Sequence, residues 1–385
     1  MTRRVLVARL DSAGDVLVSG PAVRAVAAAP DTEVTLLCGP QGAAAGRLLP
    51  GADHVLTWAA PWIVDPAPAA TSEHVAALAE LLAEARPDEA VLLTSFHQSP
   101  LPLALLLRLA GVERISGAST DYAGSLLDVR LKPGETLDED QPEPLRALAI
   151  ARAAGFELPA DDDVRLAVLP GPDVSELGIA ALGDRPYVVV HPGAAVPARA
   201  WSPERNEEAV VALAAAGWRV LVTGSPAEAE LTRAVAGTAG VDLGGRTDLA
   251  GLASILAGAA ATVTGNTGPA HLSAAVGTPV VSLFSPVVPA GRWAPYGVPV
   301  ALLGDQQAAC RGTRARECPV PGHPCLGQVT AHDVVAALTD LVGVPGATSS
   351  GSATRATRAT RASSAPAAVP DAAPTPTPTL EEATR

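Results

Sequence analysis

The chain has 385 residues, enough for two domains of ordinary size, and its net charge of −13 with a single lysine, Lys132, argues against a nucleic-acid partner. Alanine spread through helix-like segments supplies most of the 48% hydrophobic content, and no apolar run approaches the roughly 18 to 20 residues of a membrane-spanning helix. We therefore expect a cytoplasmic protein that can rest on the inner face of the membrane, with small molecules or lipid-linked sugars as partners and an oligomeric state that the sequence does not reveal.

The first half alternates short β-rich runs with longer alanine-rich helical runs. Strands are expected at residues 4–9, 33–37, 54–58, 90–94 and 114–117, and helices at 22–29, 72–84 and 101–110. This alternation is typical of a parallel sheet with helices on both faces. It gives way to an acidic loop, a helix near 144–154 and two polar stretches, so we place a domain boundary at 170/171.

The alternation restarts at 187–191, and further strands are expected at 218–223, 241–243, 261–264 and 279–284. Turns rich in Gly, Ser or Pro follow these strands, and in open α/β sheets ligands bind beyond the carboxyl ends of the strands. We predict an α/β protein of GT-B architecture, in which Rossmann-like parallel-sheet domains at 1–170 and 171–342 face each other across a cleft. The helix at 332–342 is the candidate to cross back to the first domain. Residues 346–385 are rich in Ala, Thr, Pro and Ser and are expected to form a disordered tail.

The most informative turn runs from Gly265 to His271, between an apolar strand and the helix-like run that begins at Leu272. A strand that turns directly into a helix leaves backbone N–H groups pointing at solvent, with the positive end of the helix dipole behind them. Such a turn is suited to anions, above all to phosphate. We expect the N–H groups that follow Thr267 to face the ligand.

The first turn of the chain places Asp15 at the start of a helix. The ordinary interpretation is a capping or first-turn acid. A general base for a sugar hydroxyl, however, needs a carboxylate held on a rigid edge of a cleft. Asp15 suits that role, with Asp11 as a nearby competitor.

The loop after the strand at 187–191 contains Gly193 and then Arg199. A guanidinium on a glycine-containing loop at the carboxyl end of a strand can hold two phosphate oxygens at once. The alternative is a solvated surface arginine. Trp201 is expected to pack as an anchor, because Ser202 and Pro203 have the pattern of a helix start.

Two later turns carry polar residues whose roles stay open. Glu228 could bond a ribose hydroxyl or merely favour the positive end of the helix that follows. Thr247 is a candidate ligand contact, although Thr247 or Asp248 could simply cap the next helix.

The four cysteines give little sign of a disulfide-built fold. Cys38 ends an expected strand and is a candidate core residue. Three cysteines and a histidine lie together later in the chain: Cys310, Cys318, His323 and Cys325. They lack a CxxC knuckle and three prolines interrupt their loop, so a local disulfide or free thiols are favoured over zinc.

Other motifs are missing. Without a GxGxxG after the first strand or a GxxxxGK[ST], a dinucleotide oxidoreductase and a P-loop ATPase are disfavoured. The acidic runs at 138–140 and 161–163 lie in loops with no strand leading in. We interpret them as solvated linkers rather than as a metal-holding Asp-x-Asp element, and we expect no metal site.

In the order and spacing of these motifs, the chain resembles the lipopolysaccharide heptosyltransferase family, glycosyltransferase family 9, over nearly all of residues 3–342. The resemblance rests on the following segments: Gly14-Asp15 with Pro21, His191-Pro192-Gly193 with Arg199 and Trp201-Ser202-Pro203, Gly224 to Glu228, Asn266 to His271, and the cysteine loop from Cys310 to Cys325.

The resemblance implies roles for these positions. It places the catalytic base at Asp15, the phosphate-contacting basic residue, commonly lysine, at Arg199, and the nucleoside-contacting acid at Glu228. It assigns the donor diphosphate and sugar to a loop with the residues Asn266, Thr267, Gly268 and His271. Many members carry Asp where this chain has Asn266. Gly14 and Gly193 would support the phosphate-binding loops.

The implied reaction is an inverting, metal-independent transfer of a sugar, by analogy from ADP-heptose, to a hydroxyl of a cell-envelope glycan or glycolipid. The nucleotide sugar is then a substrate and no cofactor is expected. Arg199, His271 and the N–H groups after Thr267 would stabilise the departing diphosphate. Two alternatives stay open: a nucleotide-sugar epimerase or hydrolase of the same architecture, and a binding protein without catalysis.

Overall fold

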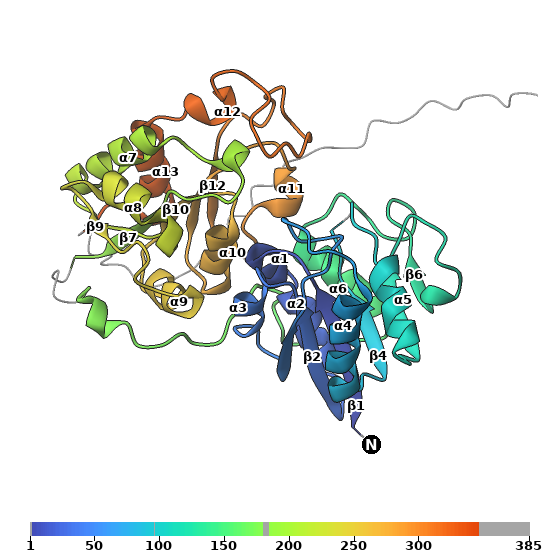
Figure 1. Cartoon of the computed structure of the whole chain (residues 1–385). Coiled ribbons are helices and arrows are strands. Elements are labelled where there is room, and N and C mark those ends of the chain that lie inside the picture. Colours follow the sequence, from blue (N-terminus) through green and yellow to red (C-terminus); the bar gives the residue numbers. More distant parts are fainter. Residues whose placement is uncertain (1, 96, 180–184, 346–385) are drawn as a thin grey trace, which may run out of the picture. The chain divides into compact units, whose positions relative to one another are not determined.

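A computed structural model of the chain describes residues 2–95, 97–179 and 185–345. Within these ranges the strands form two six-stranded parallel sheets, with the orders β3-β2-β1-β4-β5-β6 and β12-β11-β10-β7-β8-β9 (Figure 1). Numbered from its own first strand, each half has the order 3-2-1-4-5-6 of doubly wound nucleotide-binding folds. The predicted α/β fold with two Rossmann-like halves is confirmed. The tail predicted at 346–385 lies outside the described residues.

The first sheet is covered by helices on both faces, as its alternation predicts. Its strands are β1 (Arg3–Arg9), β2 (Thr32–Cys38), β3 (His54–Thr57), β4 (Glu89–Leu92), β5 (Arg114–Ala118) and β6 (Val129–Leu131). Its helices are α1 (Ala13–Val18), α2 (Gly20–Ala27), α3 (Ala43–Gly46), α4 (Ser72–Ala85), α5 (Leu101–Leu109) and α6 (Glu143–Ala153). Successive side chains of the central strand β1 point to opposite faces of the sheet. Val5 and Val7 pack in the core formed with α1, α2 and α6, and Leu6 packs in the core formed with α4 and α5.

The second sheet repeats this plan. Its strands are β7 (Tyr187–His191), β8 (Arg219–Val222), β9 (Val241–Asp242), β10 (Thr262–Gly265), β11 (Val280–Leu283) and β12 (Val300–Leu303). Its helices are α7 (Pro203–Ala215), α8 (Ala229–Ala236), α9 (Leu249–Ala257), α10 (Gly268–Ala275), α11 (Ala290–Trp293), α12 (Pro324–Gly327) and α13 (Ala331–Val342). The predicted boundary at 170/171 falls in the connection between α6 and β7.

Helix α13 does not show the expected return to the first half. It packs against α7, β12 and β11 of the second half. Its buried Val334 and Leu338 belong to the same core as Val188 and Val190 of β7. An amphipathic helix is drawn to the nearest uncovered apolar face, and here that face belongs to its own sheet.

The sequence pattern misses two strands and misplaces two helix starts. β6 and β12 are edge strands of three and four residues, and their residues are mostly half-buried, so their apolar signal is weak. The helix expected at 22–29 is two helices, which begin at Ala13 and Gly20 and meet at Ser19. α10 begins at Gly268 rather than at Leu272, because Pro269 fits the first turn of a helix.

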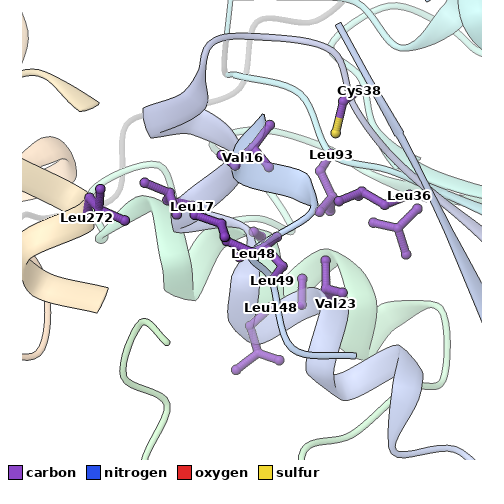
Figure 2. Packing of buried hydrophobic residues seen from close by; sticks show 14 of the residues in the cluster. Val16, Leu17, Val23, Leu36, Cys38, Leu48, Leu49, Leu93, Leu148 and Leu272 are labelled. Atoms are coloured by element: carbon purple, nitrogen blue, oxygen red, sulfur yellow. The ribbon is translucent and has the colours of Figure 1, made fainter. Parts of the chain in front are cut away.

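Helices α1 and α10 lie against each other and join the two halves. Figure 2 shows Leu17 of α1 beside Leu272 of α10, continuous with a core that includes Val23, Leu49 and Leu148. Leu17 and Leu272 are both almost completely buried. Burying an aliphatic side chain of this size contributes about 1.5–3 kcal/mol, so this apolar contact stabilises the junction.

Candidate active site

Asp15 and the turn from Asn266 to His271 lie at the topological switch points of the two sheets. In the first sheet, β1 and β4 are neighbours whose connections leave in opposite directions, and in the second sheet the same holds for β7 and β10. A crevice forms beyond the carboxyl ends of such strand pairs. Asp15 follows β1, and the turn from Asn266 to His271 follows β10.

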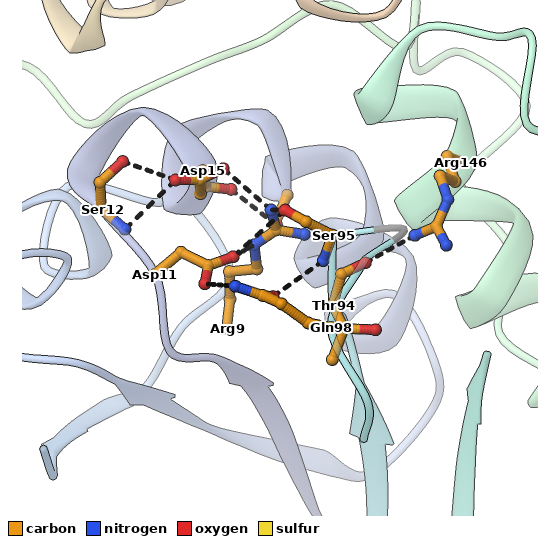
Figure 3. Close-up of polar contacts among 9 residues, drawn as sticks. Arg9, Asp11, Ser12, Asp15, Thr94, Ser95, Gln98 and Arg146 are labelled. Atoms are coloured by element: carbon orange, nitrogen blue, oxygen red, sulfur yellow. Dashed lines mark hydrogen bonds and ion pairs between the residues drawn. The ribbon is translucent and has the colours of Figure 1, made fainter. Parts of the chain in front are cut away.

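Asp15 is the third residue of α1 and forms a capping box with Ser12. Its Oδ2 accepts hydrogen bonds from the Ser12 hydroxyl at 2.5 Å and the Ser12 backbone N–H at 3.2 Å (Figure 3). Its Oδ1 accepts one from Arg9 Nη2 at 3.0 Å. The helix-capping interpretation of Asp15 is therefore correct, and the same bonds hold the carboxylate rigidly at the carboxyl edge of the sheet, as a base requires.

Arg9 is the residue that sequence reasoning missed. It ends β1 and is only 1% exposed, and its guanidinium lies between two carboxylates. Arg9 Nε is 3.0 Å from Asp11 Oδ2, and Nη2 also donates to Ser95 Oγ at 2.8 Å. An arginine at the end of a strand is usually exposed, so no local pattern indicated this burial.

The two carboxylates beside Arg9 respond differently to burial. Burial raises the pKa of Asp11, and the nearby Arg9 charge does not fully offset it. Burial also pushes the pKa of Asp15 upward, but the charge of Arg9 and the hydrogen bonds from Ser12 and Arg9 outweigh it and leave that pKa below its usual value. Asp15 is thus ionised at neutral pH and able to accept a proton.

Asp11 is more enclosed than Asp15, with side chains 9% and 19% exposed. Its Oδ1 accepts a hydrogen bond from Gln98 Nε2 at 2.6 Å, and its Oδ2 one from Ser95 Oγ at 3.5 Å (Figure 3). Between the two predicted candidates for the base, this geometry favours Asp15.

The N-terminus of α10 has no side-chain cap, unlike those of α7, α9 and α13 in the same half. The N-cap side chains Ser202 of α7, Asp248 of α9 and Thr330 of α13 each accept a hydrogen bond from a backbone N–H. Thr267, the N-cap of α10, makes no such bond. Thr267, Gly268 and Pro269 are half-buried, so a ligand can reach the uncapped end of the helix.

His271 and Arg199 place two further polar groups at this end of α10. His271 is 6% exposed, and its buried Nδ1 has no hydrogen-bond partner among residues 2–95, 97–179 and 185–345. Burial lowers the pKa of His271 to about 4, so the imidazole is neutral. Arg199 ends the 3-10 turn η4 (Pro197–Arg199), and its buried Nε also has no hydrogen-bond partner. Burial lowers the pKa of Arg199, and the Asp15 charge acts in the opposite direction.

Gly14 brings the two halves of the site close together. A Cβ atom at Gly14 would lie 3.2 Å from His271 Cδ2 and 3.3 Å from Gly268 Cα. A side chain at this position would require its neighbours to shift by a few tenths of an ångström, so glycine favours the close approach of α1 to the start of α10. The structure therefore brings Gly14, Asp15, Arg199, Gly268 and His271 together.

Of the two roles that the sequence left open for Glu228, the structure shows a capping role at the start of a helical turn. Its Oε2 accepts hydrogen bonds from the Ser225 backbone N–H and hydroxyl, both at 2.8 Å. Its carboxylate also occupies the space that a side chain at Gly193 would fill. Gly193 thus makes room for Glu228, and the side chain stays half-buried beside buried His191. Burial lowers the pKa of His191 to about 4, against the opposing charge of Glu228.

Asn266 and Thr247 lie next to residues with structural roles. Asn266 is 4% exposed, and its side-chain amide exchanges two 3.3 Å hydrogen bonds with the backbone of Ser285. This pairing ties the turn after β10 to the segment just after β11. Asp248 is the residue that caps α9, and Thr247 is half-buried just before it.

The cysteine loop does not contain a disulfide. Cys310 and Cys325 are buried, Cys318 is half-buried, and all three are free thiols, as is buried Cys38. Among the described residues, no group of three or more His, Cys, Asp or Glu side chains is arranged to hold a metal ion. Burial raises the pKa of the Cys325 thiol to about 11, so it behaves as an unreactive core residue.

A polar cavity of about 180 Å³ opens on the first half beside this network. His97, Gln98, Ser99, Thr120 and Arg146 contribute to its lining. Gln98 also donates to Asp11, so the cavity wall and the Arg9 network share a residue. Nothing in the sequence pattern pointed to this cavity, because its walls come from the ends of β4, β5 and α6.

Comparison with known families decides the relationship. The family model described as glycosyltransferase family 9 (heptosyltransferase) matches residues 98–323. The chain belongs to this family. Lipopolysaccharide heptosyltransferase 1 from Pseudomonas aeruginosa is 38% identical to this family 9 member over 121 residues, which cover 31% of this chain and 34% of that relative. The match thus spans about a third of the curated relative.

Solved structures show the same fold. ADP-heptose lps heptosyltransferase II of E. coli aligns with a TM-score of 0.66 at 20% identity, over 88% of this chain and 98% of that one. The family 9 glycosyl transferase of Veillonella parvula has a TM-score of 0.67 at 18% identity, over 88% and 97%. E. coli heptosyltransferase WaaC with ADP has a TM-score of 0.64 at 21% identity, over 88% and 99%.

The range matched by the family model begins after Asp15. The role assigned to this residue therefore depends on the geometry described above. Within the described ranges, no helix combines the length and the apolar character needed to cross a bilayer.

Proposed function

We propose that this family 9 member transfers a sugar from a nucleotide diphosphate sugar to a hydroxyl of a cell-envelope glycan or glycolipid at the cytoplasmic face of the membrane, with inversion and without a metal ion. ADP-heptose is the donor that the names of its relatives favour. One observation carries the proposal. The ionised Asp15 carboxylate interacts electrostatically with Arg199 and His271 beside the uncapped end of α10, and each of these two residues holds a buried polar atom that has no hydrogen-bond partner among the described residues.

The α10 end suits the donor diphosphate. The helix terminus carries about +0.5 of an elementary charge, and Arg199 adds a full positive charge. Neutral His271 has one N–H to donate. These groups are in place before the reaction and can stabilise the charge that develops on the departing diphosphate. Glu228 and Thr247 lie further along the same sheet edge, where the nucleoside would extend, and Asn266 shapes the turn through Ser285.

Asp15 suits the acceptor side. An inverting transfer needs one base that takes the proton of the attacking hydroxyl on the side opposite the leaving group. Asp15 belongs to the first half and the diphosphate groups to the second, so a sugar between them would be attacked from one side and released toward the other. The 180 Å³ cavity is smaller than the roughly 300–1,000 Å³ pockets that enclose whole drug-sized ligands, so it suits one sugar unit of a larger acceptor.

An exposed apolar surface supports contact with the lipid that carries such an acceptor. Leu105 and Leu109 of α5 are 48% and 77% exposed, and Tyr122 is 87% exposed. α5 packs against the 3-10 turn Gly124–Leu126, which follows Tyr122. We expect the protein to sediment with vesicles that contain the glycolipid acceptor, and Leu109→Glu to weaken this binding.

The function is tested by incubating the purified full-length protein with ADP-heptose and a panel of cell-envelope glycans and glycolipids. The expected result is ADP release that depends on an acceptor and persists in EDTA, with a mass increase of one heptose on the acceptor. Release of free sugar or formation of an epimer without acceptor would support the hydrolase or epimerase alternative. Donor binding without consumption in the whole panel would indicate a binding protein. Thermal shifts across ADP-, GDP-, UDP- and dTDP-sugars would identify the nucleotide.

A further inference from the structure

Arg9 holds the carboxylate of Asp15, the proposed general base, in place. Its guanidinium bridges Asp11 and Asp15, with Nε 3.0 Å from Asp11 Oδ2 and Nη2 3.0 Å from Asp15 Oδ1. The side chain is 1% exposed, and Nη2 is also bonded to Ser95 Oγ at 2.8 Å (Figure 3). The position of the guanidinium is therefore fixed by protein groups from the end of β1, the start of α1 and the loop after β4.

Asp11 is fixed in turn by the loop after β4. Gln98 donates to Asp11 Oδ1 at 2.6 Å, and the Gln98 side-chain oxygen accepts the Ser95 backbone N–H at 3.1 Å. The Asp11 carboxylate thus has bonds on both oxygens and is turned toward Arg9. Within the part of the chain that the structure describes, Asp15 Oδ1 accepts one hydrogen bond, from Arg9, and a carboxylate oxygen with one bond keeps an acceptor position for an incoming hydroxyl.

We propose that Arg9 is a positioning residue for the transfer proposed above, and that Asp11 is its anchor and not an alternative base. Arg9 keeps Asp15 charged and directs one of its oxygens toward the acceptor. The proposal rests on the proposed function for its catalytic meaning, but the state of Asp15 can be measured without turnover.

The charges around Asp15 explain why Arg9 is needed. Burial on its own pushes the pKa of Asp15 upward, and Arg9 supplies the largest opposing effect. The other charged or titratable groups that act on Asp15 or are acted on by it are Asp11, His97, Glu143, Arg199 and His271. Asp11 and Glu143 are carboxyl groups whose own pKa values burial raises, and both histidines have pKa values of about 4. None of them replaces the fixed charge of Arg9 and its direct bond.

The test compares three variants at the site with a control on the same strand. Arg9→Gln removes the cation, Asp11→Asn removes the anchor charge, and the double variant removes both while leaving the net charge of the trio unchanged. Arg3→Gln is the matched control, because Arg3 also lies on β1 in a bidentate ion pair, with Glu89, at the opposite end of the strand. Each variant is measured for the pH profile of kcat, the Kd for ADP, and the Asp15 carboxyl titration by ¹³C NMR.

Arg9→Gln should move the acid limb of kcat and the Asp15 titration upward by at least one pH unit, so that kcat falls at acidic pH values at which the wild type is still active. Asp11→Asn should cost less than tenfold and leave the limb in place or lower it. The Kd for ADP should stay within threefold throughout, and Arg3→Gln should match the wild type. If Arg9→Gln does not fold, the charge-balanced double variant replaces it, with an upward shift again expected.

The proposal would be overturned if the titration of Asp15 did not move in a folded Arg9 variant. It would also be overturned if Asp11→Asn lost the acid limb of kcat while Asp15→Asn kept full activity, because Asp11 would then be the base. If the wild-type protein transfers no sugar to any acceptor, the proposed function fails. The ¹³C titration then still decides whether Arg9 controls Asp15.

Discussion

Replacing Gly14 with alanine tests the close approach of α1 and α10. The new methyl group would sit 3.2 Å from His271 Cδ2 and 3.3 Å from Gly268 Cα, so its neighbours must yield by a few tenths of an ångström. Overpacking of this kind costs about 1–3 kcal/mol, while alanine in place of glycine within a helix regains up to about 1 kcal/mol. We therefore expect the free energy of unfolding to fall by about 0–2 kcal/mol, which the fold should tolerate.

The effect on activity should be larger than the effect on stability. Asp15 adjoins Gly14, so separating α1 from α10 moves the base away from the diphosphate groups. A misplacement of 1 Å can cost about 100-fold in rate, and a smaller shift should lower kcat about tenfold. The assay is ADP release at saturating donor and acceptor, with urea unfolding measured in parallel.

Gly291→Ala is the matched control for Gly14→Ala. Gly291 is likewise the second residue of a short helix, α11, and a Cβ atom there would meet nothing within 4 Å. It should keep wild-type kcat. A Gly14→Ala protein with kcat within twofold of wild type and unchanged stability would refute the reasoning, because α1 and α10 could then not meet as described.

Three further predictions follow from the site. Asp15→Asn should lower kcat about 10²–10⁴-fold, as expected for loss of a general base, while calorimetry finds the Kd for ADP unchanged; normal turnover would exclude Asp15 as the base. Asn266→Ala leaves the buried N–H and C=O of Ser285 without partners, so urea unfolding should show a loss of about 2–4 kcal/mol, and an unchanged midpoint would contradict that pairing. His191 and His271 have folded pKa values of about 4 against 6.5 in the unfolded chain, so the unfolded chain binds more protons between these values. Stability should therefore fall as pH drops from 6.5 to 4, by up to about 1.4 kcal/mol per pH unit for each histidine, and His271→Asn should flatten this slope.

Much of the fold could be predicted because its signals are local. Strand and helix alternation depends on side-chain periodicity along a few residues, and it is strong in the buried central strands β1, β7 and β10. It is weak in the edge strands β6 and β12, which were missed. The start of α10 was misplaced by four residues, because Gly268 and Pro269 suggest a loop until the turn is seen to be helical.

The sequence predicted individual residues of the candidate site, but not the hydrogen bonds between them. Asp15, Arg199 and the turn at 266–271 were predicted from their places after strands, where doubly wound folds bind ligands, and their roles stay predictions. Whether Glu228 and Asp248 cap helices could not be decided from spacing alone, because a cap depends on the backbone geometry that the structure provides. The partner of Asn266, Ser285, lies 19 residues away, just after the neighbouring strand β11.

The sequence by itself determined the two parallel sheets and the positions of the strand-to-helix turn after β10 and of the acidic residue after β1, since each follows from periodicity or from the pattern of one turn. Only the tertiary structure decided that Arg9 is buried between Asp11 and Asp15, that Gly14 touches α10, and that α13 stays on its own half. These facts depend on which segments become neighbours once β1 pairs with β4 and α1 packs against α10, and that choice is made by the burial of many apolar side chains together rather than by any short stretch of the chain.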